Sequence, residues 1–132
     1  MNEIVNAPGL AEPVGFAHAV VAGPGRTVYL GGQTAQGQDG AIIGSTVAEQ
    51  FDVAAGNVVT ALTAAGATPD QLVSLVIYTT AVPAYKAALK ELGPLWRKHF
   101  GRHYPAVALL GVAALFDEEA MIELIGTAVI PS

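Results

Sequence analysis

The chain has 132 residues, of which 52% are hydrophobic and only 13% are charged, with a formal net charge of −5. The length fits one domain spanning residues 1–132, and the acidic balance argues against a nucleic-acid partner, because general nucleic-acid binders carry a basic field. The absence of cysteine excludes disulfides, thiolate catalysis and cysteine-type zinc sites, and no apolar run reaches the ~18 residues of a membrane helix.

Residues 1–13 form a weakly patterned lead without the basic region and apolar core of a signal peptide, so we expect a cytoplasmic protein. Residues 15–22 predict a first strand, followed by a tight turn at 23–26 and a second strand at 27–30 that pairs antiparallel with the first. Gly31 and Gly32 at the end of this strand allow either a β-bulge or the close approach of a ligand to the backbone.

A capping box at Thr46 and Glu49 predicts the start of a helix that runs to about Ala65 and ends at Gly66. Gln50 and Asn57 are seven residues apart and share a face of this helix, where we expect a structural role for both.

A single capped turn is predicted at residues 68–71, and the nearly continuous apolar and β-branched run at 73–80 predicts the clearest strand of the chain. A helical region follows from about 83 to 100, and we expect Gly93-Pro94 to divide it into 83–92 and 94–100. Five of the six lysines and arginines lie between residues 86 and 102, a clustering that fits a solvated helix face.

Two apolar runs, 104–112 and 121–129, predict the last two strands, with a turn at 116–120 between them. The predicted order ββαβαββ gives an α+β fold with a single mixed or antiparallel sheet packed by two helical segments on one face. The other face then has to be covered by partner subunits, which also explains a mean hydropathy of +0.48 in so small a chain.

Glu123 is the one acid inside the last apolar strand, and an unpaired buried carboxylate costs several kcal/mol (roughly), so it either faces a cavity or meets a donor. The alternative is an edge strand that turns this side chain to solvent. A carboxylate in an apolar cleft can exchange a proton with water, and glycine-rich strand ends such as Gly31–Gln33 can offer amides to an oxygen. Together with His18, these residues suit hydrolysis or tautomerisation of a small unsaturated nitrogen compound. His99 and His103 do not form a metal pair at helical spacing, so we expect no metal and no cofactor.

The chain resembles the RidA/YjgF family, also called the L-PSP endoribonuclease family, over nearly its whole length. Gly31-Gly32-Gln33 is similar to the Ser-Gly-Gln strand end of the family, and Gly15 to Val20 resembles the Gly-Tyr-Ser-His-Ala-Val opening of some members. The first helix and the C-terminal signature are matched at Gln50, Asn57, Leu62, Gly66-Ala67, Pro105-Ala106, Ile122-Glu123-Leu124 and Ala128-Val129.

The resemblance implies a chorismate-mutase-like fold, a homotrimer, and sites for small-molecule ligands in the clefts between subunits. Well-known members hydrolyse enamines and imines to release ammonia and a 2-keto acid. In those members, the arginine after Pro-Ala holds the substrate carboxylate and the strand glutamate acts on water. The resemblance therefore implies that Glu123 is catalytic and that Phe16, Ala17, His18, Gly31, Gly32, Gln33 and Val107 bind substrate.

Two departures from the family pattern lie at the expected site. Val107 stands at the arginine position and offers no salt bridge to a carboxylate, and Phe16 or Ala17 stands where active members carry a tyrosine. Arg102 or His103 is a possible substitute for the arginine. Two functional readings follow: a deaminase-like hydrolase for a less polar imine or enamine, and a non-catalytic trimer that binds a metabolite or a partner. A third, an endoribonuclease or translation inhibitor, rests on the older family name alone, and the acidic pI of about 4.9 argues against it.

Overall fold

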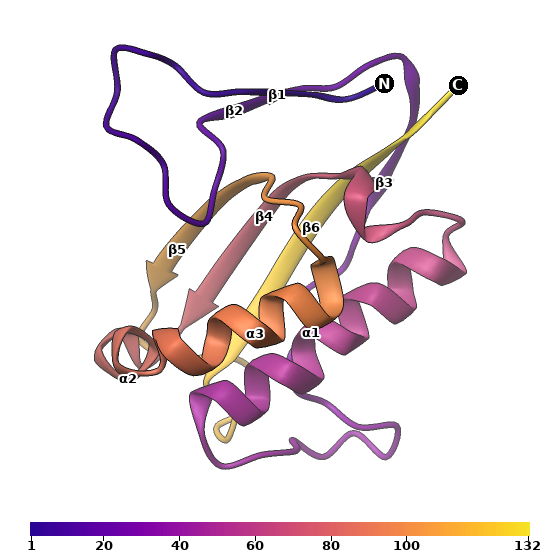
Figure 1. Ribbon diagram of the computed structural model, residues 1–132. Helices are drawn as coiled ribbons and strands as arrows, with labels where there is room; N and C mark the ends of the chain where they lie inside the picture. Colours follow the sequence, from indigo (N-terminus) through magenta and orange to yellow (C-terminus); the bar gives the residue numbers. More distant parts are fainter.

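A four-stranded sheet forms the centre of the molecule, and the computed structural model describes it together with every other residue from 1 to 132 (Figure 1). Its strand order is β3-β6-β4-β5. The strands are β3 (Gly25–Tyr29), β4 (Leu72–Thr79), β5 (Ala106–Gly111) and β6 (Ile122–Pro131). Strand β6 is antiparallel to both of its neighbours, whereas β5 is parallel to β4, so the sheet is mixed and the predicted α+β class is confirmed.

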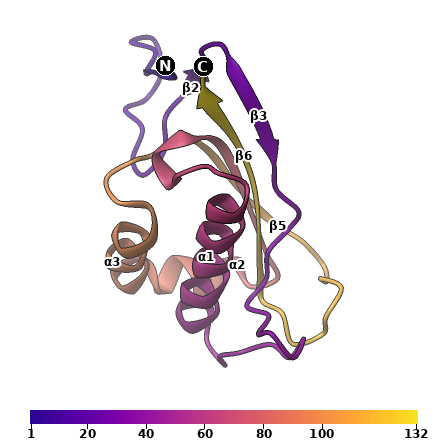
Figure 2. The same ribbon diagram turned by 90° about the vertical axis from the view of Figure 1, so that its right-hand side faces the viewer.

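All helices lie on one face of this sheet, as the edge-on view of Figure 2 shows. They are α1 (Val47–Ala64), α2 (Val82–Ala87) and α3 (Leu89–Phe100), with a short 3₁₀ turn at Pro69–Gln71. Helices α2 and α3 form the crossover that joins the parallel strands β4 and β5, as a parallel pair requires. No helix is long and apolar enough to cross a membrane.

The core lies between α1, α3 and the helix-facing side of the sheet. Phe51 and Leu62 from α1 and Leu75 from β4 are at most 1% exposed. From α3, Leu92, Trp96 and Phe100 follow one another at intervals of four residues, which places all three on the buried side of the helix. The indole of Trp96 stacks on the ring of Tyr104, with 5.6 Å between ring centroids.

The predicted boundaries of α1 are confirmed. The backbone N–H of Glu49 donates to Thr46 Oγ1 over 3.1 Å, and the Glu49 carboxylate accepts from the Thr46 N–H, which completes the capping box. At the other end, Gly66 has φ 85°, a backbone conformation that side-chain-bearing residues rarely adopt.

Gln50 and Asn57 have the structural role that was predicted for them. The buried Gln50 amide donates to the carbonyls of Gly44 and Glu119, and its oxygen accepts from the N–H of Met121 over 2.7 Å. Asn57 donates to the carbonyls of Thr34 and Gln36. Both side chains therefore tie α1 to the loops that flank it.

The predicted pairing of residues 15–22 with residues 27–30 is wrong. Strand β2 (Ala19–Val21) instead pairs with β1 (Glu3–Val5), a strand missed within the weakly patterned lead, and the two form a separate two-stranded sheet. Strand β3 turns away to β6, with which it forms five residue pairs instead of the three that β2 offers to β1. Strand β3 therefore pairs with the longer strand β6, although β6 is far away in the sequence.

The predicted break of the second helical region at Gly93-Pro94 is also wrong, because Pro94 lies inside α3. The break falls at Ala88. The N–H of Ala88 donates to the Ala84 carbonyl at the end of α2, and the Ala88 carbonyl accepts from the N–H of Leu92 at the start of α3. Pro94 costs α3 the bond to the Lys90 carbonyl, but both residues are exposed, so water can take that place.

Candidate functional site

The first half of the candidate site surrounds Glu123 on the helix-free face of the sheet. Glu123 pairs with Tyr78 of β4 across the strands, so both side chains point to this face. Its neighbours Ile122 and Leu124 are fully buried on the opposite side. The predicted alternation along β6 is confirmed, and the Glu123 side chain is half-buried instead of lying in the dry core.

Gly32 gives the Glu123 carboxylate its place. A Cβ at Gly32 would overlap the Glu123 Oε2 atom, whereas one at Gly31 would meet open space. The adjacent Gln33 fixes this segment along β6, because its backbone N–H and carbonyl each bond Leu124 over 2.8 Å. Gly32 therefore permits the close approach of a carboxylate of the same chain. The sequence alone had suggested a β-bulge or an external ligand as the reason for a glycine at this position.

No donor among the 132 residues of the chain forms a hydrogen bond or an ion pair with the Glu123 carboxylate. Its carboxylate oxygens remain available to water or to a molecule outside the chain. The arrangement supports a role for Glu123 as an acceptor of protons or hydrogen bonds.

The second half of the candidate site is an apolar pocket of about 630 Å³ between α2, α3, β5 and the segment before β2. Eleven of its thirteen lining residues are hydrophobic. They are Val14, Gly15, Phe16, Phe51, Ile77, Tyr85, Leu89, Leu92, Gly93, Trp96, Tyr104, Val107 and Leu109. Two of the predicted site residues, Phe16 and Val107, thus lie in one pocket, and no charged side chain lines it.

The two halves lie on opposite faces of the sheet. Tyr78 is the partner of both Glu123 and Leu110, whereas Val107 is the partner of Leu75, whose side chain is in the core. Residues paired across strands share a face, so Glu123 points away from the helices and Val107 points toward them. A single chain therefore does not bring these two predicted site residues together.

Ala17 and His18 have local contacts that account for both residues. Ala17 is buried, and its N–H donates to the Pro105 carbonyl over 2.9 Å, which holds the segment before β2 against the start of β5. His18 Nδ1 accepts from the N–H of Ala7 over 2.9 Å, so Nε2 carries the proton and donates to the Ala11 carbonyl. The imidazole therefore organises the N-terminal loop instead of pointing into the pocket.

Neither suggested substitute for the arginine reaches the pocket. His103 Nε2 lies 2.7 Å from the Leu72 carbonyl, and Arg102 is exposed on the loop after α3. Sequence reasoning missed the importance of Tyr85 and Trp96 as pocket walls. The helical spacing of Leu89, Leu92 and Trp96 predicts a buried side of this helix. Leu92 and Trp96 are buried, whereas Leu89 is 57% exposed, and spacing alone could not show that this side borders a cavity. Burial raises the pKa of the Tyr85 phenol, which therefore stays neutral in the pocket.

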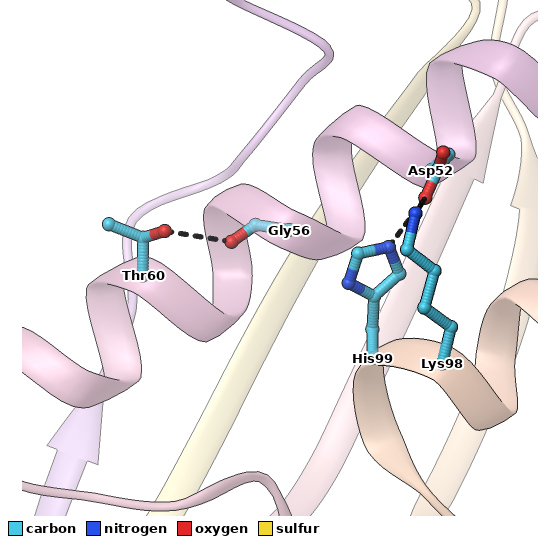
Figure 3. A network of polar contacts seen from close by, with 5 residues as sticks. All are labelled: Asp52, Gly56, Thr60, Lys98 and His99. Atoms are coloured by element: carbon cyan, nitrogen blue, oxygen red, sulfur yellow. Dashed lines mark hydrogen bonds and ion pairs between the residues drawn. The ribbon is translucent and has the colours of Figure 1, made fainter.

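A separate polar network joins α1 to α3 outside both halves (Figure 3). His99 Nε2 donates to Asp52 Oδ1 over 2.6 Å, and Lys98 Nζ donates to the same oxygen over 2.9 Å. The bond from His99, followed by that from Lys98, holds the pKa of the Asp52 carboxyl below its usual value of 3.8. No three acidic or histidine side chains lie together as a metal-ligand set.

Comparison with known proteins identifies the relatives of this chain. The family model described as endoribonuclease L-PSP matches residues 7–130. A conserved Rid-family protein of unknown function from Yersinia pestis has a similar structure, with a TM-score of 0.87, 30% identity and 98% coverage of each chain. A member of the YjgF/YER057c/UK114 family from Mycobacterium tuberculosis is 26% identical, with a TM-score of 0.63, covering 98% of this chain and 100% of the other. No curated protein matches the sequence. The chain therefore belongs to the endoribonuclease L-PSP family, which is also the Rid or YjgF family.

Proposed function

We propose that this Rid-family chain is a deaminase-like hydrolase for a small, uncharged imine or enamine. The reaction takes place in a cleft between two copies of the chain, where Glu123 of one copy meets the apolar pocket around Val107 of the other. The observation that carries the proposal is the Glu123 carboxylate, which lies against Gly32 and has no partner in its own chain.

The position of the two half-sites supports a site between subunits. Because Glu123 and Val107 face opposite sides of one sheet, they can act on one molecule only if a second copy supplies one of them. A homotrimer, in which each copy offers a different surface to each neighbour, would form such a cleft three times.

In the proposed reaction, the Glu123 carboxylate accepts a proton from water as the water oxygen bonds to the imine carbon. The imine nitrogen takes up a proton from solvent, which gives a carbinolamine. The carbon–nitrogen bond then breaks as Glu123 returns its proton to the departing nitrogen and the carbinolamine hydroxyl gives its own proton to solvent, so the products are a carbonyl compound and ammonia. A carboxylate of this kind contributes typically about 10²–10⁴-fold as a general acid–base catalyst.

The lining of the pocket supports an uncharged substrate. A carboxylate brought to Val107 would lose its water without gaining a cation, at a cost of several kcal/mol (roughly). The pocket around Val107 has only hydrophobic residues and glycines on its walls, and its tyrosines are neutral donors at most. An apolar or aromatic side group is the chemistry that these walls accommodate.

The test is a coupled assay in which an amine oxidase produces an imine from an apolar primary amine and semicarbazide competes for it. We expect the wild-type chain to accelerate ammonia release and Glu123→Gln, which keeps the shape and removes the base, to abolish that acceleration. Full activity of Glu123→Gln would remove Glu123 from the reaction.

A non-catalytic role in binding a metabolite is the second candidate, and the uncharged lining of the pocket favours it. Under this alternative an apolar ligand binds with the same affinity to wild type and Glu123→Gln, and neither accelerates the hydrolysis of any imine. Calorimetric titration with the product aldehydes, run beside the coupled assay, separates the two candidates.

A further inference from the structure

The loop between β5 and β6 carries the most exposed large hydrophobic side chain of the molecule. Phe116 is 99% exposed, so none of its ring is covered by its own chain. A fully exposed phenylalanine on a loop costs solubility and gives the monomer no stability, and such residues mark contact sites when an apolar cavity is available to receive them.

The apolar pocket described above is such a cavity. Its rim includes Leu89, which is 57% exposed, and Phe16, which is 38% exposed, so the pocket is open at this side. The volume of about 630 Å³ leaves room for an aromatic ring beside a small ligand.

Charges around the two features are complementary. Phe116 is followed by Asp117, Glu118 and Glu119, and none of these acids has an ion pair within the chain. On the other side, Lys86 and Arg97 each follow a lining residue of the pocket and are also without an ion pair. The same holds for Lys90, next to Leu89. Helices α2 and α3, which line the pocket, carry four basic residues and one acid, Glu91. Their net positive charge is opposite in sign to the charge of the acidic loop that carries the exposed ring.

We propose that Phe116 of a second copy of this chain inserts into the apolar pocket of the first and becomes one wall of the site. The proposal rests on the proposed function, because it concerns the same cleft between copies. Phe116 stands seven residues before Glu123 on the loop that leads into β6, so the copy that supplies the ring is also the copy that supplies Glu123 to the proposed cleft. The ring then selects a substrate with an apolar or aromatic side group, which it contacts directly.

The contact joins two different surfaces, the β5–β6 loop of one copy and the helix-side pocket of another. Such head-to-tail contacts close into a ring when the rotation between copies allows it. A homotrimer built in this way would contain three identical Phe116–pocket contacts, with no ring of Phe116 left in water.

Cross-linking tests the contact without any substrate. The chain has no cysteine, so Glu118→Cys, two residues after Phe116, combined with Leu89→Cys introduces the only two thiols and keeps the ring. Both positions are exposed, and neither residue belongs to the core. Oxidation should give covalent dimers and trimers, whereas either single variant, or Leu10→Cys with Leu89→Cys, should not give trimers. A double variant that cross-links no more than its single variants would overturn the proposal.

Fluorescence provides the second readout, because Trp96 is the one tryptophan and lines the pocket. Phe116→Ala should raise the dissociation constant of the assembly by about tenfold or more, as loss of an anchoring aromatic residue does. Dilution of that variant should shift the Trp96 emission to longer wavelength, Phe116→Leu should lie between it and wild type, and Leu10→Ala should match wild type. Unchanged assembly and emission in Phe116→Ala would assign the pocket to another occupant.

These readouts separate the proposal from the proposed function. Cross-linked trimers from a chain that hydrolyses no imine would support the docking of Phe116 and remove the reaction. Activity that depends on Glu123, in a chain whose cysteine pair does not cross-link, would support the reaction and overturn the docking.

Discussion

Gly32 is the residue on which the position of the Glu123 carboxylate depends. Gly32→Ala would place a methyl group on Oε2, but that oxygen is the end of a flexible side chain and can move aside. We therefore expect the free energy of unfolding to change by about 1 kcal/mol or less, while Glu123-dependent turnover falls at least about tenfold because the base is misplaced.

Gly9→Ala is the control, because a Cβ there also meets nothing within 4 Å and Gly9 lies outside both half-sites. It should leave both stability and turnover close to wild type. The comparison is made with urea unfolding curves and the coupled imine assay. Equal activity in the two variants would show that the carboxylate does not need its place against Gly32.

Val107 sets the second expectation at the scale of single residues. Hydrogen bonds to charged groups contribute roughly 1.5–3 kcal/mol each, and Val107 supplies none to a carboxylate. We expect little or no acceleration of 2-iminobutanoate or 2-iminopropanoate hydrolysis by the wild-type chain. Val107→Arg should gain activity only in part, since the apolar walls of the pocket remain, and Val107→Leu should gain none. Keto-acid release in a semicarbazide competition assay measures all three, and rapid release by wild type would contradict the expectation.

At the scale of elements, the polar network of Asp52, His99 and Lys98 between α1 and α3 makes the stability of the fold depend on pH. Asp52 is bonded by His99 and Lys98, and its pKa is lower in the folded chain than the usual 3.8. Its contribution to stability is therefore present above pH 3.8 and is lost as the pH falls through the lowered pKa. Because the Asp52 side chain is 34% exposed, we expect a contribution below about 1 kcal/mol.

Asp52→Asn should be less stable than wild type at neutral pH, and the difference should shrink in acid, where the wild-type carboxyl is also neutral. Urea unfolding at a series of pH values measures this difference. Glu91→Gln, an exposed acid of α3 without an ion pair, should show no such trend. A difference in stability between Asp52→Asn and wild type that stays constant with pH would show that the charge of the Asp52 carboxylate does not contribute to this polar network.

Local patterns predicted the elements better than they predicted the partners of those elements. The capping box at Thr46 and the continuous apolar run of β4 are complete within a few residues, and both predictions are confirmed. The choice of β6 as the partner of β3 depends on residues about a hundred positions apart, which no short pattern contains. Pro94 shows the same limit, because its tolerance within α3 depends on the exposure of that side of the helix.

For the candidate site, too, local patterns predicted single residues but not how distant strands combine them. Alternation along β6 placed Glu123 away from the core, and the burial of Ile122 and Leu124 confirms that placement. The direction of Val107 depends on the register of β5 against β4, which the sequence of β5 alone does not specify. The sequence therefore identified residues for both half-sites without indicating that they face opposite ways.

At the scale of the whole molecule, one face of the sheet has no helix on it (Figure 2). Leu110 points to this face and is 48% exposed, and its neighbour Tyr78 lies beside Glu123. We expect native mass spectrometry to show a species of three chains that survives dilution, because assembly would bury this surface. Leu110→Glu should give a monomer, since assembly would bury its charge.

The monomer formed by Leu110→Glu should keep the far-UV circular dichroism of wild type, because Leu110 is not part of the core. Leu10→Glu, at a residue 61% exposed on the N-terminal loop, is the control and should remain assembled. A wild-type chain that is stable as a monomer would remove both the assembly and the site between subunits.

The central position of β6 in the sheet has a consequence for the order of folding. During synthesis, β3 and β4 emerge from the ribosome long before β6, yet neither can join the other until residues 122–131 lie between them. Up to that point, the nascent chain holds strands with open edges and a core that lacks the β6 residues Ile122, Leu124 and Ala128. Sheets built from such distant pairings form slowly and leave their edges open to other chains in the meantime. The synthesis of β6, the last of the four sheet strands in chain order, therefore determines when the inner edges of β3 and β4 are paired and the risk of aggregation falls.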